Sequence, residues 1–131
     1  MYALLLLTLT ADVTKDTVNI EGTWVVESAT VDGKAEDDIK GEKMTFKNGT
    51  LTVKTKQKDE KGTYKLDSAQ KPKTIDVTDD GKNETYAGIY KLDGDRLTIC
   101  VPDKAGNARP KEFTAKEGSR QMVLELKREK K

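Results

Sequence analysis

The chain has 131 residues, which is enough for one domain with a single hydrophobic core. Its 24 basic and 23 acidic side chains nearly cancel and leave a formal net charge of +1. Phosphate binding needs a concentrated basic face, so this balance excludes a nucleic-acid partner. The last three residues, 129–131, are predicted to form a solvated basic tail.

Residues 1–11, "MYALLLLTLTA", carry no charge and contain a run of leucines. The run is far shorter than the roughly 20 apolar residues of a membrane span, so stable membrane insertion is excluded. Two interpretations stay open, a remnant of a signal peptide cleaved before Asp12 and an added edge strand. The first predicts an extracytoplasmic protein, periplasmic or secreted, and the second is compatible with cytoplasmic retention. Residues 12–21 are interpreted as a linker and residues 22–128 as the folded domain.

Short stretches in which apolar and polar residues alternate follow one another from residue 22 onward. A period of two is typical of strands with one buried and one wet face. The stretches are KMTF (43–46), TLTVK (50–54), TYKLD (63–67), TIDV (74–77), RLTICV (96–101) and QMVLELK (121–127).

Turn-forming residues separate these stretches at short intervals and predict reversals between antiparallel neighbours. The turn candidates are KNGT (47–50), DEKG (59–62), TDDGK (78–82), LDGD (92–95), DKAGN (103–107) and KEGS (116–119). The only helical candidate in the domain is residues 35–41, a turn or two ended by a glycine.

Together these signals predict eight or nine strands joined as a meander. Closure removes the exposed edges of such a sheet, so we expect an all-β, up-and-down antiparallel barrel of about eight strands with at most one short helix. A Greek-key β-sandwich is the alternative, since alternation does not determine strand order.

Gly22, Trp24 and Arg128 resemble the lipocalin pattern, in which a tryptophan closes one end of the barrel and an arginine of the last strand packs over it. The glycine permits a tight turn, and the guanidinium adds a cation–π contact. Four longer blocks resemble an uncharacterised, planctomycete-type bacterial family of exported lipocalin-like domains. They are GTWVVESATVDGK, YKLDSAQKPKTIDV, GIYKLDGDRLTICV, and RPKEF followed by LELKR. The resemblance implies the barrel fold and export, and it implies no catalytic residue.

The residue types of catalytic and metal sites are largely missing. The chain has no histidine, which removes the commonest general base and zinc ligand. We therefore predict no catalytic residue, metal or cofactor, and a carboxylate-based hydrolase remains only a remote alternative. Cys100 is the single cysteine, so an intramolecular disulfide is excluded, and we interpret its side chain as a small packed hydrophobe rather than a reactive thiol.

An eight-stranded barrel can hold side chains alone or one small ligand. The first possibility predicts a cell-envelope module with a filled barrel, an exposed apolar patch and a protein partner. The second, which we favour, predicts a monomer that takes a small apolar ligand at the end opposite Trp24. The predicted ligand-binding residues are Phe46, Tyr64, Tyr86, Tyr90 and Arg109. The full set of predicted inward residues is Trp24, Val26, Met44, Phe46, Leu51, Val53, Tyr64, Leu66, Ile75, Val77, Tyr90, Leu97, Ile99, Phe113 and Leu124.

Two interpretations of Arg109 are possible. Arg109 either faces an anionic ligand at the barrel mouth or forms a salt bridge with a neighbouring acid, and we favour the salt bridge. Phe113 is expected to anchor a short strand in the core. Residues 86–90 are apolar on both faces, which predicts that the N-terminal segment or a partner covers the outer one.

Overall fold

The computed structural model describes residues 15–130 of the chain. The predicted signal remnant, residues 12–14 of the predicted linker and Lys131 lie outside the described residues. Residues 15–19 form a short helical segment that leads into the first strand. The described part contains nine strands, β1 (Gly22–Val31), β2 (Lys34–Ala35), β3 (Lys43–Lys47), β4 (Thr50–Lys54), β5 (Asp59–Asp67), β6 (Thr74–Asp79), β7 (Glu84–Asp93), β8 (Arg96–Pro102) and β9 (Gln121–Arg128).

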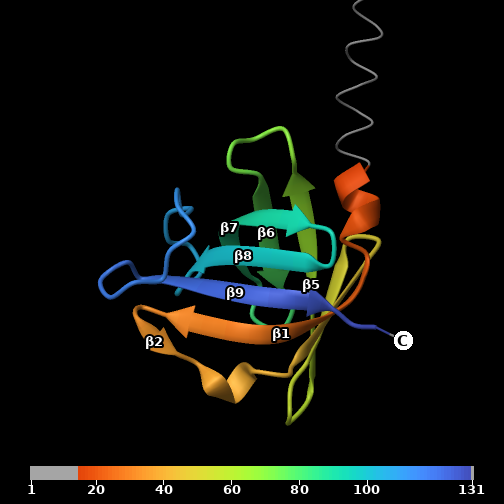
Figure 1. The fold of residues 1–131 in the computed structure, drawn as a ribbon, viewed down its shortest axis with the longest axis horizontal. Helices are drawn as coiled ribbons and strands as arrows, with labels where there is room; N and C mark the ends of the chain where they lie inside the picture. Colours follow the sequence, from red (N-terminus) through yellow and green to blue (C-terminus); the bar gives the residue numbers. More distant parts are fainter. Residues whose placement is uncertain (1–14, 131) are drawn as a thin grey trace, which may run out of the picture.

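Eight of these strands form a closed antiparallel barrel (Figure 1). The hydrogen-bonded order is β1-β3-β4-β5-β6-β7-β8-β9, and β9 pairs back with β1 over the register Trp24↔Arg128 to Val31↔Met122. The two-residue strand β2 is an addition on the end of β1. The up-and-down barrel is therefore confirmed, because every barrel strand pairs with its neighbour along the chain and no Greek-key crossing occurs within residues 15–130.

The predicted helical turn is present as a single 3-10 turn, η1 (Asp37–Ile39), and Gly41 follows it with a positive φ of 88°. Three of the six predicted reversals, KNGT, TDDGK and LDGD, join consecutive strands. The stretches DKAGN and KEGS both lie in the one loop between β8 and β9, and DEKG is not a turn, because residues 59–62 lie inside β5. Gly62 is there for a different reason: a Cβ on it would lie 2.1 Å from the carbonyl oxygen of Thr78 on β6. Only a residue without a side chain permits this close approach of the two strands.

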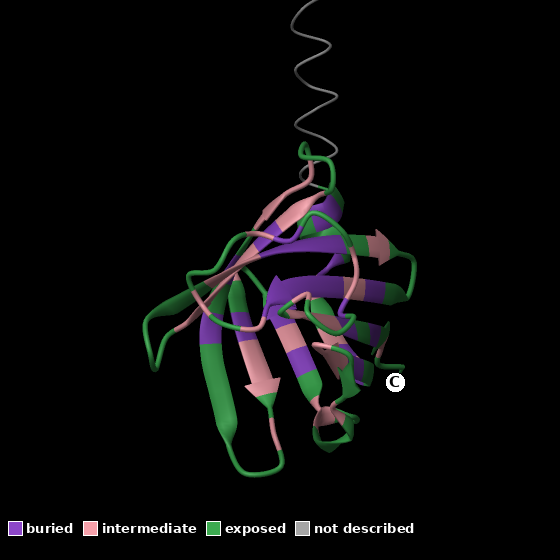
Figure 2. Cartoon of the chain, turned by 90° about the vertical axis from the view of Figure 1, so that its left-hand side faces the viewer, coloured by how far each residue is buried: buried purple, intermediate pink, exposed green. Residues whose placement is uncertain are grey.

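Alternation along the strands sorts side chains between the barrel interior and the outer surface, as the banding of buried and exposed positions shows (Figure 2). Every predicted inward residue except Phe113 belongs to the hydrophobic cluster or packs against it. Ile20, which precedes β1, is also fully buried in this cluster. Part of the segment interpreted as a linker, residues 15–20, thus contributes to the core.

Residues 103–120 form a long loop that packs on the outer face of β7 and β8. Ile89 and Cys100, which point outward from these strands, are 1% and 0% exposed. The Cys100 thiol lies 3.6 Å from the carbonyl oxygen of Glu112 and 3.7 Å from that of Thr114. This loop covers the outer face of β7, so the prediction of a cover by the N-terminal segment or a partner is wrong.

Phe113 belongs to the same loop. No strand forms around it, its ring is half-buried outside the barrel, and the Lys91 ammonium lies 4.5 Å from the ring centroid. The prediction of a core strand at Phe113 is therefore wrong, since its apolar surface packs on the outer wall. No helix among residues 15–130 has the length and apolar character needed to cross a membrane.

Candidate ligand-binding site in the barrel

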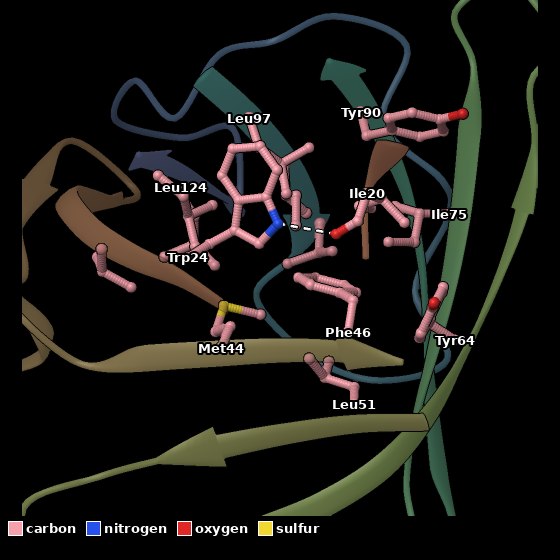
Figure 3. Packing of buried hydrophobic residues seen from close by; sticks show 14 of the residues in the cluster. Ile20, Trp24, Met44, Phe46, Leu51, Tyr64, Ile75, Tyr90, Leu97 and Leu124 are labelled. Carbon is pink, nitrogen blue, oxygen red and sulfur yellow. Dashed lines mark hydrogen bonds between the residues drawn. The ribbon is translucent and has the colours of Figure 1, made fainter. Parts of the chain in front are cut away.

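One end of the barrel is closed around Trp24, which is fully buried. Its indole Nε1 donates a 2.8 Å hydrogen bond to the carbonyl oxygen of Ile20 (Figure 3). The Arg128 guanidinium lies over the indole ring, 4.3 Å from its centroid, as the resemblance to lipocalins implied. Gly22 has a φ of 122°, which glycine adopts without strain, and this brings the chain under the Arg128 side chain.

Aromatic side chains fill the space next to Trp24. Phe46 is fully buried, and its ring meets that of Tyr64 edge to face, with centroids 5.0 Å apart and an angle of 79° between the planes. This geometry is favourable for aromatic pairs. Burial raises the pKa of the Tyr64 hydroxyl. Figure 3 shows these rings together with Ile20, Ile75 and Leu97 in one packed group. This end of the barrel is a core and leaves no room for a ligand.

A buried polar contact joins the helical segment to the same end. The Tyr90 hydroxyl donates a 2.7 Å hydrogen bond to Asp16 Oδ2, and Lys73 Nζ lies 2.9 Å from the same oxygen. Burial, and then the bond to the Asp16 carboxylate, raise the pKa of Tyr90. Tyr90 is therefore a neutral donor whose hydroxyl is already used within the protein.

The opposite end of the barrel is hollow. A cavity of about 350 Å³ opens there between the ends of β4, β6 and β8 and the starts of β5, β7 and β9. This volume lies at the small end of the range of about 300–1,000 Å³ that is typical of ligand pockets. Its apolar lining consists of Met44, Leu51, Val53, Val77, Tyr86, Ile99, Val101, Met122 and Leu124.

Charged residues surround the mouth of this cavity. Glu60, Asp79 and Asp103 contribute three carboxylates, and Lys61 and Lys82 contribute two ammonium groups. The site therefore combines an apolar wall with a polar, mainly acidic rim. Such an arrangement can hold the apolar part of a molecule inside and a polar group at the entrance.

The structure separates the predicted ligand-binding residues into three places. Tyr86 lines the cavity. Phe46, Tyr64 and Tyr90 point into the barrel, as predicted, but they lie in the filled end around Trp24. Alternation along a strand distinguishes inside from outside and does not distinguish one end of a barrel from the other.

Arg109 lies outside the barrel, in the loop over β7. Its guanidinium is 2.9 Å from the Asp76 carboxylate and donates a 2.8 Å hydrogen bond to the carbonyl oxygen of Gly88. The favoured salt bridge is thus present. The residue lines an open outer hollow of about 830 Å³ with Lys65, Lys71 and Lys111. Although this hollow is larger than the barrel cavity, it lies on the outer surface and eight of its twelve lining residues are polar or charged, so we place the candidate site in the barrel.

The sequence did not predict that Val101, Met122 and the acidic residues at the mouth line the cavity. Both residues belong to strands whose alternation was predicted correctly, Val101 to β8 and Met122 to β9. Their distance along these strands from the end that packs around Trp24 could have placed them at the opposite end of the barrel. The acidic residues were interpreted as turn-forming residues of β-hairpins. Among residues 15–130 no group of three acidic, cysteine or histidine side chains is arranged to hold a metal ion.

Comparison with known protein families identifies this fold from the sequence as well. The family model of the lipocalin-like domain matches residues 20–99, which is more than half of the chain and covers the segment from Ile20 to β8. No curated protein and no solved structure matches the chain. The matched region contains Trp24, Phe46, Tyr64 and Tyr90 of the closed end and most of the cavity wall, whereas Arg128 lies beyond it. Because the family model matches more than half of the chain and the fold is an eight-stranded meander barrel, the chain belongs to the family of lipocalin-like domains.

Proposed function

We propose that the protein binds one small apolar molecule in the cavity at the open end of the barrel. The observation that carries this proposal is the apolar lining of a 350 Å³ hollow within an otherwise packed interior. Burial of apolar ligand surface would supply the main driving force, at roughly 25 cal/mol per Å² before the cost of association. The proposal includes no catalytic step, because the chain has no histidine and nothing in the cavity resembles an activated nucleophile.

The alternative, an interaction module of the cell envelope, predicts a filled barrel and an exposed apolar patch. The barrel is not filled throughout, because a cavity opens at the end opposite Trp24. Val18, in the helical segment, is the single large hydrophobic side chain that is exposed among residues 15–130. A lone exposed valine is ordinary on a protein surface and does not form a docking patch. These observations favour ligand binding.

A substitution that fills the cavity tests the proposal. Val77→Phe places a larger side chain in the cavity wall, and Val18→Phe makes the same change on the surface. Native mass spectrometry of the protein purified gently from its host, followed by extraction and identification of any bound molecule, is the measurement. We expect one small molecule per chain in the wild-type protein and in Val18→Phe, and a loss of at least tenfold in occupancy in Val77→Phe. A wild-type protein that binds neither a host molecule nor added apolar compounds would refute the proposal.

We also propose that the protein is an exported bacterial domain, either periplasmic or secreted. This proposal is supported by the apolar, uncharged residues 1–11 and by the sequence blocks that resemble exported domains. N-terminal sequencing of the protein recovered from each compartment of its host tests the idea. Export predicts a mature chain that begins near Asp12, whereas an intact Met1 in the cytoplasmic fraction would contradict it.

A further inference from the structure

The wall of the barrel is interrupted at its hollow end, between β7 and β8. The paired register of these strands ends at Ile89↔Cys100, although β7 already begins at Glu84 and β8 continues to Pro102. Each strand keeps its other neighbour, since β6 pairs with β7 from Glu84 and β9 pairs with β8 as far as Pro102. The edge of residues 84–88 that faces β8 therefore has no strand beside it within residues 15–130.

The cavity lies directly behind this break. Tyr86 lines it from the β7 side, and Val101 and Pro102 line it from the β8 side. Gly88 marks the point at which the two strands stop running together. A Cβ there would lie 2.6 Å from a methyl group of Val101 and 2.8 Å from the carbonyl oxygen of Cys100, so only a residue without a side chain fits. The break begins beyond this close contact, toward the start of β7.

Residues 104–108, in the first part of the loop after β8, lie beside the open edge of β7 (Figure 1). The Gly106 amide donates a 3.2 Å hydrogen bond to the carbonyl oxygen of Thr85, and this is the one backbone bond between residues 104–108 and β7 within residues 15–130. Apart from the half-buried Ala105, residues 104–108 are exposed. A stretch with so few buried contacts separates from its neighbours at a low cost in free energy.

The later part of the same loop is fixed to the barrel. Ala115 is buried. The Gln121 side-chain amide donates a 2.8 Å hydrogen bond to the carbonyl oxygen of Thr114. The Asp32 carboxylate accepts hydrogen bonds from the backbone amides of Gly118, at 2.8 Å, and Arg120, at 3.0 Å. The loop therefore divides into a lightly held first part and an anchored second part.

Both ends of the lightly held stretch are fixed points. The Asp103 amide donates a 2.9 Å hydrogen bond to the carbonyl oxygen of Arg120. At the other end, the Arg109 guanidinium donates to the carbonyl oxygen of Gly88 at 2.8 Å and lies 2.9 Å from the Asp76 carboxylate. Residues 104–108 are thus a short strap between two anchors, and Arg109 ties one of these anchors to β6 and β7.

A hollow of about 510 Å³ lies between residues 107–109 and the fixed part of the loop, so the strap has room to move. We infer that residues 104–108 are a side gate, which swings away from β7 and lets the ligand pass between β7 and β8 into the cavity. The inference rests on the proposed binding function and adds the route of the ligand. The contacts of Arg109 hold the gate closed, so they set how fast the ligand enters and leaves.

Exchange kinetics distinguish a gate from a binding contact. A gate changes the association and dissociation rates by the same factor and leaves the dissociation constant unchanged, because it does not contact the bound ligand. The probe is N-phenyl-1-naphthylamine, a neutral apolar fluorophore, followed by stopped-flow fluorescence. We expect Arg109→Gln to raise both rates about fivefold, which corresponds to the loss of a hydrogen bond of about 1 kcal/mol. Arg96→Gln, which removes an exposed pairing with Glu27, is the matched control and should leave both rates unchanged.

Hydrogen exchange of the Gly106 amide, followed by NMR, reports the opening of the gate itself and should be faster in Arg109→Gln. If this exchange is faster while both probe rates stay the same, the ligand enters elsewhere and the inference is wrong, although apolar binding stands. The inference is also wrong if Arg109→Gln changes neither quantity, or if it weakens binding without changing the association rate. If neither this probe nor 1-octanol binds the wild-type protein, the proposed function fails and the inference falls with it.

Discussion

Arg128, on the last strand of the barrel, packs on Trp24 of the first strand. The guanidinium lies 4.3 Å from the centroid of the indole, and its terminal nitrogens donate to the carbonyl oxygens of Asn19, at 2.6 Å, and Glu21, at 3.0 Å. One side chain of β9 therefore holds β1 and the segment before it. A planar group with several fixed donors is needed for this, which lysine does not have.

We accordingly expect Arg128→Lys to lower the free energy of unfolding by about 1–2 kcal/mol, although the charge is retained. Urea denaturation followed by the fluorescence of Trp24, the single tryptophan of the chain, measures the change. Arg96→Lys is the control, since Arg96 is exposed and its pairing with Glu27 at 3.0 Å is expected to contribute less than about 0.5 kcal/mol. An unchanged urea midpoint for Arg128→Lys would show that the contact does not stabilise the fold.

The hydrogen bond between Tyr90 and Asp16 is expected to hold the helical segment 15–19 on the barrel. A double-mutant cycle with Tyr90→Phe and Asp16→Asn should give a coupling of about 1–2 kcal/mol in the free energy of unfolding. Tyr86→Phe is the matched control, because Tyr86 lies in the open cavity and should show no coupling with Asp16→Asn. Additive effects of Tyr90→Phe and Asp16→Asn would contradict the prediction.

The barrel and the composition of its core were predictable from the sequence, because alternation and turn chemistry are local signals. The positions that were missed depend on distant parts of the chain. Gly62 looked like a turn residue, but its role comes from the Thr78 carbonyl on the next strand. Phe113 looked like core because the sequence does not show that a loop can cover the outer wall. Tyr90 was correctly placed inside, but its partner Asp16 lies in a segment that was interpreted as a linker.

Gly62→Ala should be among the most damaging single changes in the chain. Its Cβ would meet the Thr78 carbonyl oxygen at 2.1 Å, so β5 and β6 would have to separate. We expect a loss of about 3 kcal/mol or more, or failure to fold. Gly81→Ala provides the comparison, because its Cβ would meet only the Asp79 side chain, at 3.4 Å. Thermal unfolding of both variants by circular dichroism distinguishes them, and equal melting temperatures would refute the close approach.

The loop over β7 and β8 should protect Cys100 from thiol reagents. Burial raises the pKa of the Cys100 thiol, which keeps it protonated at pH 8. We expect almost no reaction with 5,5′-dithiobis(2-nitrobenzoic acid) in the native protein and one equivalent after denaturation. Arg109→Gln removes the loop contacts to Asp76 and Gly88 and should accelerate the native reaction at least severalfold, whereas Arg96→Gln should not. Equal rates in the two variants would show that Arg109 does not anchor the loop.

Glu42 should make the stability of the protein depend on pH. Burial, and then repulsion by Glu60, raise the pKa of Glu42 above its usual 4.5, and Lys56 opposes this in part. A carboxyl group with a raised pKa in the folded state favours folding below its unfolded pKa, and that contribution is lost as the pH rises through the folded pKa. Glu42→Gln should therefore match the wild-type protein near pH 4 and melt at a higher temperature at pH 7.

Melting curves between pH 4 and pH 7 measure this difference. Glu125→Gln, at an exposed position of β9, controls for the loss of one negative charge. If the two variants change the melting temperature equally at every pH, the environment of Glu42 is not responsible.

The packed end and the hollow end of the barrel also bear on protein engineering. Residues such as Val77, Tyr86 and Met122 line the cavity and are only partly buried where they pack against the core cluster that contains Trp24. A library randomised at these positions would leave the fully buried residues around Trp24 unchanged, so that most members are expected to fold and can be screened for ligand binding. A library randomised at Phe46 or Tyr90 would mainly select for chains that still fold. The short barrel thus offers a compact scaffold on which new specificities can be selected at one end only.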